Sequence, residues 1–167
     1  MDFRKSKKED VEHIMIIIKK AQEYLKSQGI NQWQNGYPDE AAIEKDIDDG
    51  ISYVLLDGEK IVGTTAFSFD GESTYEKVHD GNWLSDEEYG VIHRMAVDLD
   101  SGRRGIAGEI LKHSEDLCSK RDVRSIKVDT HRDNMAMQNF LKKNGFIFCG
   151  IIYLKDKTER LAFEKVL

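Results

Sequence analysis

Cysteine, proline and long hydrophobic runs are scarce in this sequence. The two cysteines, Cys118 and Cys149, form no CxxC pair, so neither a disulfide framework nor a structural zinc cluster is expected, and we predict no metal site. The longest aliphatic run, Ile14 to Ile18, is far shorter than the roughly 20 residues of a membrane helix. The N-terminal residues contain no apolar secretory segment. We therefore expect a cytoplasmic protein that does not enter a membrane.

An excess of basic residues is also absent. The chain has 25 Lys and Arg against 31 Asp and Glu, a net charge of −6, whereas nucleic-acid-binding proteins typically carry a basic excess. Nucleic acid is therefore not an expected partner. The 167 residues are 40% hydrophobic and 34% charged, which is typical of an ordered globular chain. No repeat, linker or Ser/Gly-rich stretch marks a boundary, so we expect residues 1–167 to form a single domain.

Hydrophobic spacing predicts strands that alternate with helices. Ser6 and Glu9 form the pattern of a capping box, and Asp133 is the expected cap of the last helix. Helical crossovers after the strands 88–97 and 123–129 require a parallel centre, while hairpins at both ends are antiparallel. We therefore predict an α/β (α+β) fold with a mixed sheet of about seven strands and helices on both faces. Strands are expected at 3–5, 51–56, 60–69, 88–97, 123–129, 145–154 and 160–166, and helices are expected to begin near residues 6, 39, 104 and 133.

The turn after the predicted strand 88–97 combines glycines with two arginines directly before a helix. The first N–H groups of a helix are unpaired and carry a partial positive charge, and small residues let an anion approach the backbone. The segment can therefore cradle a pyrophosphate, although a glycine-rich surface turn would contain the same residues. Neither a P-loop string nor a GxGxxG fingerprint occurs. The cradle residues are Arg103, Arg104, Gly105, Ile106, Ala107 and Gly108.

The same segment resembles the signature of the GNAT superfamily of acetyl-CoA-dependent N-acetyltransferases. That signature is [QR]-x-x-G-x-[GA] between a strand and a helix, and residues 102–107 match it except that Gly102 stands at the Gln/Arg position. A second family segment, an Asn followed about ten residues later by Gly-Phe, is matched by Asn134 and by Gly145-Phe146. The order of elements agrees over nearly the whole chain, and residues 30–38 resemble small bacterial members.

The resemblance implies a fold and a reaction. Acetyl-CoA would lie where the strand 88–97 splays from the strand 123–129, with its pantetheine arm on the backbone of Met95, Ala96 and Val97 and on Asn134. The N–H of Met95 would donate to the thioester carbonyl oxygen. The acetyl group would pass directly to a primary amine of a small molecule or peptide in a ternary complex. Many relatives dimerise, so the resemblance also admits a homodimer.

The residue that would protonate the leaving thiolate departs from the family pattern. Many relatives use a tyrosine four residues before the Gly-Phe, where this chain has Leu141. His93 is the first alternative for proton transfer. It precedes Met95 by two, so both side chains are expected on one face of the strand, and it resembles the histidine of arylalkylamine acetyltransferases. Glu88 and Tyr153 are further candidates. The structural alternatives are a histidine tucked against the sheet for His93 and a solvated side chain for Glu88.

The acceptor end of the predicted site is less defined. Trp33 and Tyr37 lie in the loop between the first two helices, which in relatives walls the acceptor cleft, although loop aromatics also serve as anchors. Neither cysteine falls on the splayed strands, which disfavours an acyl-enzyme. Because the usual tyrosine is missing, a non-catalytic acyl-CoA-binding sensor or partner domain remains the alternative function.

Overall fold

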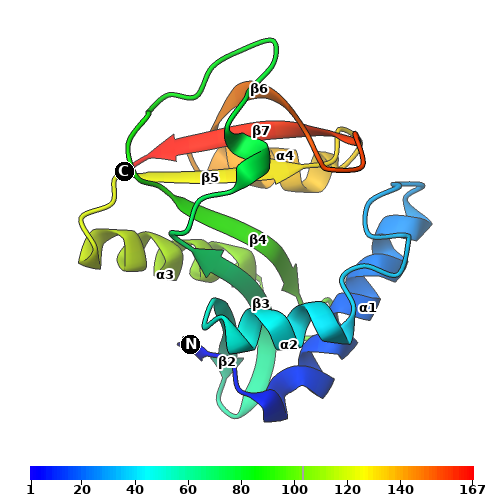
Figure 1. Cartoon of the computed structure of the whole chain (residues 1–167). Coiled ribbons are helices and arrows are strands. Elements are labelled where there is room, and N and C mark those ends of the chain that lie inside the picture. The colour runs from blue at the N-terminus through cyan, green and yellow to red at the C-terminus, as the bar shows by residue number, and fades with distance from the viewer. Residues whose placement is uncertain (103) are drawn as a thin grey trace. The chain divides into compact units, whose positions relative to one another are not determined.

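The computed structural model describes residues 1–102 and 104–167, and shows strands and helices in the predicted order (Figure 1). Arg103, one of the predicted cradle residues, lies outside the described residues. Among the described helices, none is both long and apolar enough to cross a membrane. The strands are β1 (Asp2–Lys5), β2 (Ser52–Asp57), β3 (Lys60–Ser68), β4 (Gly90–Val97), β5 (Ser125–Thr130), β6 (Ile147–Tyr153) and β7 (Glu159–Val166). The α-helices are α1 (Val11–Ser27), α2 (Glu40–Asp48), α3 (Ile106–Lys120) and α4 (Met135–Lys143), and the 3-10 turns are η1 (Lys8–Asp10) and η2 (Ser73–Tyr75).

The strands form a mixed sheet of seven strands in the order β1-β2-β3-β4-β5-β7-β6. β4 and β5 are parallel, with Gly90 opposite Ile126 and Val91 opposite Lys127. The pairs β1–β2, β2–β3, β5–β7 and β6–β7 are antiparallel. The prediction of a parallel centre between antiparallel ends is therefore confirmed.

The chain forms two compact units. The first comprises residues 1–67 and 93–113, and the second comprises residues 68–92 and 114–167. β4 and α3 contribute residues to both units.

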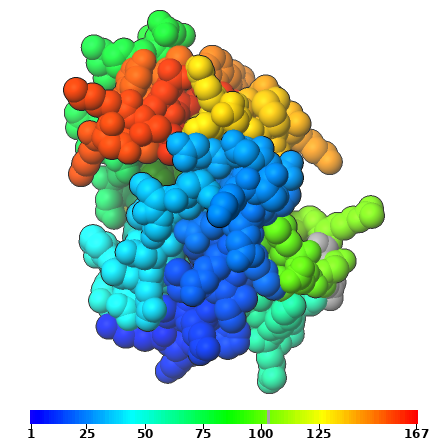
Figure 2. Space-filling view, turned by 90° about the vertical axis from the view of Figure 1, so that its right-hand side faces the viewer, coloured from blue at the N-terminus to red at the C-terminus, as the bar shows by residue number. Residues whose placement is uncertain are grey.

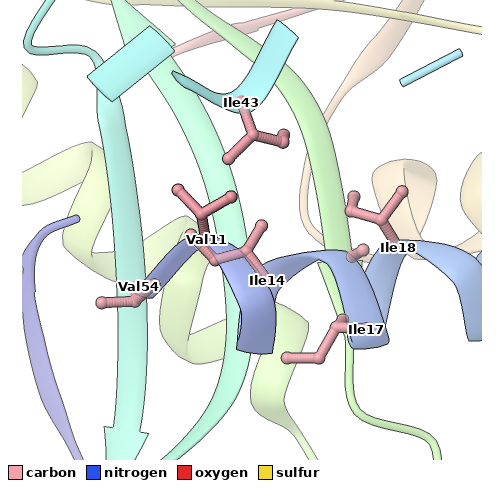
Figure 3. Close-up of a cluster of buried hydrophobic side chains, with 7 residues drawn as sticks. Val11, Ile14, Ile17, Ile18, Ile43 and Val54 are labelled. Atoms are coloured by element: carbon pink, nitrogen blue, oxygen red, sulfur yellow. The ribbon is translucent and has the colours of Figure 1, made fainter. Parts of the chain in front are cut away.

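The first unit has a hydrophobic core on each face of its strands. The adjacent residues Val54 and Leu55 of β2 are both 0% exposed but belong to different clusters. Because successive side chains on a strand point to opposite faces, helices cover both faces of β2. On one face Val54 packs with Ile43 of α2 and with α1 residues that recur at helical spacing: Val11, Ile14, Ile17 and Ile18 (Figure 3). On the other face Leu55 and Val62 pack with Ile106 and Ile110 of α3.

In this unit α3 packs against β3 at a glycine, Gly63. A Cβ on Gly63 of β3 would lie 2.8 Å from Cδ1 of Ile110 and 3.0 Å from Cγ2 of Ile106, so a larger residue here would force these α3 side chains to shift. On the outer surface of the unit, α1 and α2 lie side by side, as their blue and cyan atoms show (Figure 2).

In the second unit, a few side chains anchor the long segment between β3 and β4, which is otherwise largely exposed. Tyr75 of η2 is 2% exposed and packs with Val91, Ile152 and Ala162. The ammonium of Lys127 lies 4.5 Å from the centre of the Trp83 ring, whose Nε1 donates to the carbonyl of Tyr75 at 2.7 Å. Trp83 thus anchors this segment to the second unit.

The first helix begins differently from the prediction, because Ser6 and Glu9 do not form its capping box. Asp10 instead accepts a hydrogen bond from the N–H of Lys7 at 2.7 Å, and Ser6 is buried and accepts one from the hydroxyl of Ser52 at 2.8 Å. The capping pair is therefore Lys7 and Asp10, one residue later than predicted, and the hydroxyl of Ser6 is engaged by β2 instead.

Candidate active site

The centre of β4 contains a residue with left-handed backbone. Arg94 has a φ of 51°, a conformation that costs a non-glycine residue about 1–3 kcal/mol. It interrupts the regular alternation of the strand between His93 and Met95. The prediction that these two side chains share a face assumed a regular strand, and β4 is not regular at this point.

The Arg94 cluster, which comprises Arg94, Asp46 and Tyr37, holds this residue in place. The Nε and Nη2 atoms of Arg94 donate to the two carboxylate oxygens of Asp46 at 2.6 and 2.7 Å, and Nη1 donates to the hydroxyl oxygen of Tyr37 at 2.7 Å. The side chains of Arg94 and Asp46 are only 17% and 8% exposed. Burial alone would lower the pKa of Arg94, but its interactions with the Tyr37 hydroxyl and the Asp46 carboxylate outweigh burial and raise it, so the guanidinium remains charged.

The start of α3 has the features of an anion cradle. The carbonyl of Gly105 accepts the first helical hydrogen bond, from the N–H of Glu109 at 3.0 Å. By helix geometry the N–H groups of residues 105–108 then have no acceptor within the helix. Gly105 has a φ of 82°, which favours glycine, and a Cβ placed on Gly105 or Gly108 would meet no atom within 4 Å. No described atom therefore crowds the backbone of these two glycines.

The last residues of β4 use their side chains for packing. Met95 and Val97 pack against the cluster that contains Ile106, and Ala96 is buried on the α1 side. Their N–H and C=O groups are the parts that could pair with an extended ligand. In β4 the carbonyl of His93 accepts a hydrogen bond from the hydroxyl of Thr65 at 3.2 Å, and the side chain of His93 is half-buried.

The two expected acceptor-site aromatics differ in their surroundings. Trp33 has a φ of 61° and packs, partly buried, against the α1 core. Tyr37 is 43% exposed, and its hydroxyl belongs to the Arg94 cluster. Both stay predicted acceptor contacts, and Tyr37 is the more exposed of the two.

The predicted site residues of the second unit have structural partners. Glu88 is exposed and forms an ion pair with Arg121 at 2.9 Å. Tyr153 is 43% exposed, and its ring lies edge-on to that of His79 with 5.0 Å between centroids. Both residues belong to the second unit.

The cap of α4 is Asn134 rather than the predicted Asp133. Oδ1 of Asn134 accepts from the N–H of Met137 at 3.1 Å. The N–H of Asp133 instead donates to Nδ1 of His131 at 3.1 Å. Asn and Asp cap helices about equally well, so the sequence did not distinguish these neighbours. Any ligand contact of Asn134 must be made alongside this cap.

Neither cysteine is suited to be a nucleophile. Burial raises the pKa of the Cys118 thiol to about 12, against an opposing hydrogen bond from the Gly90 backbone. Burial also raises the pKa of Cys149. Both thiols therefore stay protonated near neutral pH, and the nucleophile in thiol chemistry is the thiolate. Leu141 is 0% exposed and packs in the core, where it cannot transfer a proton.

Sequence reasoning did not identify the Arg94 cluster. A charged residue inside a mostly apolar strand is the signal that could have indicated Arg94. Among residues 1–102 and 104–167, no group of three or more His, Cys, Asp or Glu side chains could hold a metal ion.

Comparisons with known proteins agree with this architecture. The profile of the acetyltransferase (GNAT) family matches residues 17–146. A search of curated proteins finds no match. A GNAT-family acetyltransferase structure from Streptococcus agalactiae is 29% identical, with a TM-score of 0.90 over 99% of this chain and 95% of that chain. An acetyltransferase structure from Staphylococcus aureus Mu50 is 25% identical, with a TM-score of 0.75 over 99% of both chains.

A third structure was solved with a ligand. PaiA N-acetyltransferase from Thermoplasma acidophilum, in complex with coenzyme A, shares the fold at 14% identity, with a TM-score of 0.74 over 99% of this chain and 98% of that chain. The family match over most of the sequence and the agreement of the seven-stranded sheet with family structures lead to one assignment. This chain belongs to the GNAT family of acetyltransferases and is an acyltransferase.

Proposed function

We propose that this enzyme transfers an acetyl group from acetyl-CoA to a primary amine of a small molecule or peptide, directly and within a ternary complex. The observation that carries the proposal is the start of α3. Four consecutive backbone N–H groups there, those of residues 105–108, have no acceptor within the helix, and the Cβ positions of Gly105 and Gly108 are open. Ile106 packs against the same cluster as Met95 and Val97.

The described residues fit acetyl-CoA. The N–H groups of residues 105–108 would bind the pyrophosphate, with the charge of Arg104 near them, and Arg103 is proposed from its place in the motif. The backbone of Met95, Ala96 and Val97 would pair with the pantetheine arm, and Asn134 is proposed to contact it as well. Bound acetyl-CoA supplies an acetyl group activated as a thioester.

Two groups of β4 would act on the reacting atoms. His93 would remove the proton that makes the incoming amine an ammonium ion, since imidazole suits proton transfer near neutral pH. The N–H of Met95 would donate to the oxygen that gains negative charge when the amine attacks. Glu88 already pairs with Arg121, so we place it second to His93.

Among the described residues, no recorded contact identifies the acid that would take the role of the missing tyrosine. Tyr153 remains a candidate acid, because its exposed ring can reach solvent or a ligand. Water would otherwise protonate the leaving thiolate. The raised pKa values of both cysteines support direct transfer, because an acyl-enzyme would need a thiolate.

The acceptor would contact Tyr37. A guanidinium can only donate hydrogen bonds, so the Tyr37 hydroxyl accepts from Arg94 and keeps its own proton for another acceptor. The exposed hydroxyl can thus donate to an oxygen or nitrogen of the acceptor molecule.

Initial rates over a grid of acetyl-CoA and amine concentrations test direct transfer. The amine panel should hold polyamines, amino sugars, arylalkylamines and peptides with free N-termini. Direct transfer predicts reciprocal plots that intersect, and parallel lines would instead indicate an acyl-enzyme. Acetyl-CoA binding without release of CoA by any amine would favour the non-catalytic alternative.

A further inference from the structure

We infer that Arg94 and Asp46 are positioning residues for acetyl transfer: the Arg94 cluster holds the left-handed backbone of β4 and thereby orients His93 and the N–H of Met95. The inference rests on the proposed function, because it assigns those two groups their roles. It concerns residues that have no expected contact with the reacting atoms themselves.

The unfavourable backbone conformation of β4 lies between the two groups that would act on the reacting atoms. Arg94 is not a glycine and yet has a φ of 51°. Such residues persist only where surrounding contacts enforce them. Arg94 lies directly between His93 and Met95, so its φ sets the relative orientation of their peptide groups. Relaxation of this residue to an extended conformation would turn the Met95 N–H away from its present direction.

Side-chain contacts of Arg94 can enforce this conformation. Three hydrogen bonds of 2.6 to 2.7 Å fix the guanidinium to Asp46 and Tyr37. Both partners come from outside the sheet, Asp46 from α2 and Tyr37 from the loop before it. α2 is itself anchored by Ile43 in the α1 core, so Asp46 is held firmly.

The first unit contains a second buried Arg–Asp pair, without a left-handed backbone. Arg4 of β1 makes an equivalent bidentate pair with Asp10, at 2.7 and 3.0 Å, and the Asp10 side chain is 10% exposed against 8% for Asp46. Arg4 is not among the residues with positive φ. A buried Arg–Asp pair alone therefore does not produce the left-handed backbone, which makes Asp10 a matched control.

Kinetics of Asp46→Asn and Asp10→Asn test the inference. Both changes weaken one buried bidentate pair, but only Asp46→Asn should release the β4 backbone. We expect kcat to fall about 10- to 100-fold in Asp46→Asn, because small displacements of reacting groups are costly. The KM for acetyl-CoA should stay within about twofold, and Asp10→Asn should keep both constants near those of the wild type.

Two substitutions of Arg94 separate backbone conformation from charge. Arg94→Ala and Arg94→Gly remove the same guanidinium, but glycine adopts a positive φ without steric cost. We expect Arg94→Gly to retain a higher kcat than Arg94→Ala. Equal losses would mean that the guanidinium acts through its charge and would overturn the inference.

Hydrogen–deuterium exchange supplies a readout that needs no turnover. In the ligand-free protein, a peptide that covers residues 90–97 should exchange faster in Asp46→Asn than in the wild type, while Asp10→Asn should leave its exchange unchanged. Unchanged exchange and kcat in Asp46→Asn would overturn the inference. If no amine supports turnover in the wild type, the proposed function fails, and the exchange comparison still decides whether the cluster holds β4.

Discussion

The hydroxyl of Tyr75 donates a hydrogen bond to Oδ1 of Asp129 at 2.6 Å and so ties the segment before β4 to β5. Burial raises the pKa of Tyr75 well above its usual value near 10, and the negative charge of Asp129 acts in the same direction. Ionisation of the Tyr75 phenol would therefore destabilise the folded second unit.

Tyr75→Phe should lower the free energy of unfolding by about 1.5–3 kcal/mol at pH 8, the usual range for a hydrogen bond to a charged group. The stability that a raised pKa contributes is fully present below the unfolded pKa of about 10 and is lost as the pH rises above it. The stability gap between wild type and variant should therefore narrow above pH 10. Denaturant titrations from pH 8 to 11 measure it, with Tyr24→Phe on the exposed side of α1 as control. A gap that stays constant would contradict the assignment.

A negative charge placed at Gly105 tests whether the cradle binds the pyrophosphate of acetyl-CoA. Acetyl-CoA at 100 times its Kd should stabilise the wild type by about 2.7 kcal/mol. Gly105→Asp should abolish this gain, because it puts a negative side chain beside the N–H groups that would bind pyrophosphate. Gly58→Asp is the matched control: Gly58 also has a positive φ, of 63°, and an open Cβ position, but lies in the β2–β3 turn. Thermal shifts with and without acetyl-CoA measure the gain, and its full retention in a folded Gly105→Asp variant would place the pyrophosphate elsewhere.

Asn134 has one observed and one proposed role, and two substitutions separate them. Asn134→Ala should cost about 1 kcal/mol of stability through the lost cap, and should also raise the KM for acetyl-CoA if the side chain binds pantetheine. Asn134→Ser keeps a capping oxygen but removes the amide, so it should restore stability and leave the KM raised. A normal KM in both variants would show that the cap is the whole function of the residue.

His93 is the proposed base. His93→Ala should lower kcat by about 10²- to 10⁴-fold and remove the acidic limb of the pH–rate profile. His93→Gln preserves much of the shape without the basicity and should be about as slow. Acetyl-CoA affinity should change little, because the proposed cofactor contacts are backbone groups farther along the chain. Near-normal kcat with an unchanged profile in both variants would make His93 structural and turn attention to Glu88.

The sequence predicted the order of elements and the mixed sheet because those features depend on local periodicity. The stripe of α1 that includes Ile14 and Ile18 and the hairpin turn at Asp57-Gly58 are visible within short windows. Gly102, Gly105 and Gly145 could likewise be recognised, because a positive φ selects glycine, and all three have one.

The Arg94 cluster could not be predicted in this way. Asp46 and Arg94 are 48 positions apart, and no local rule pairs them. A left-handed φ at an arginine depends on tertiary contacts, whereas strand periodicity assumes regular alternation. The assumption that His93 and Met95 share a face rested on that alternation. Caps were misplaced by one residue for a similar reason, since Asp133 and Asn134 are both good caps and only the observed contacts distinguish them.

The central claim is that an amine accepts the acetyl group directly from acetyl-CoA bound at the start of α3. The most direct measurement is the rate of CoA release from acetyl-CoA across the amine panel, with mass spectrometry of the amine, for the wild type and for Gly105→Asp. The account predicts CoA release that depends on the amine, an equal amount of N-acetylated product, and loss of both in Gly105→Asp. CoA release that is independent of every amine, or that persists undiminished in Gly105→Asp, would contradict it.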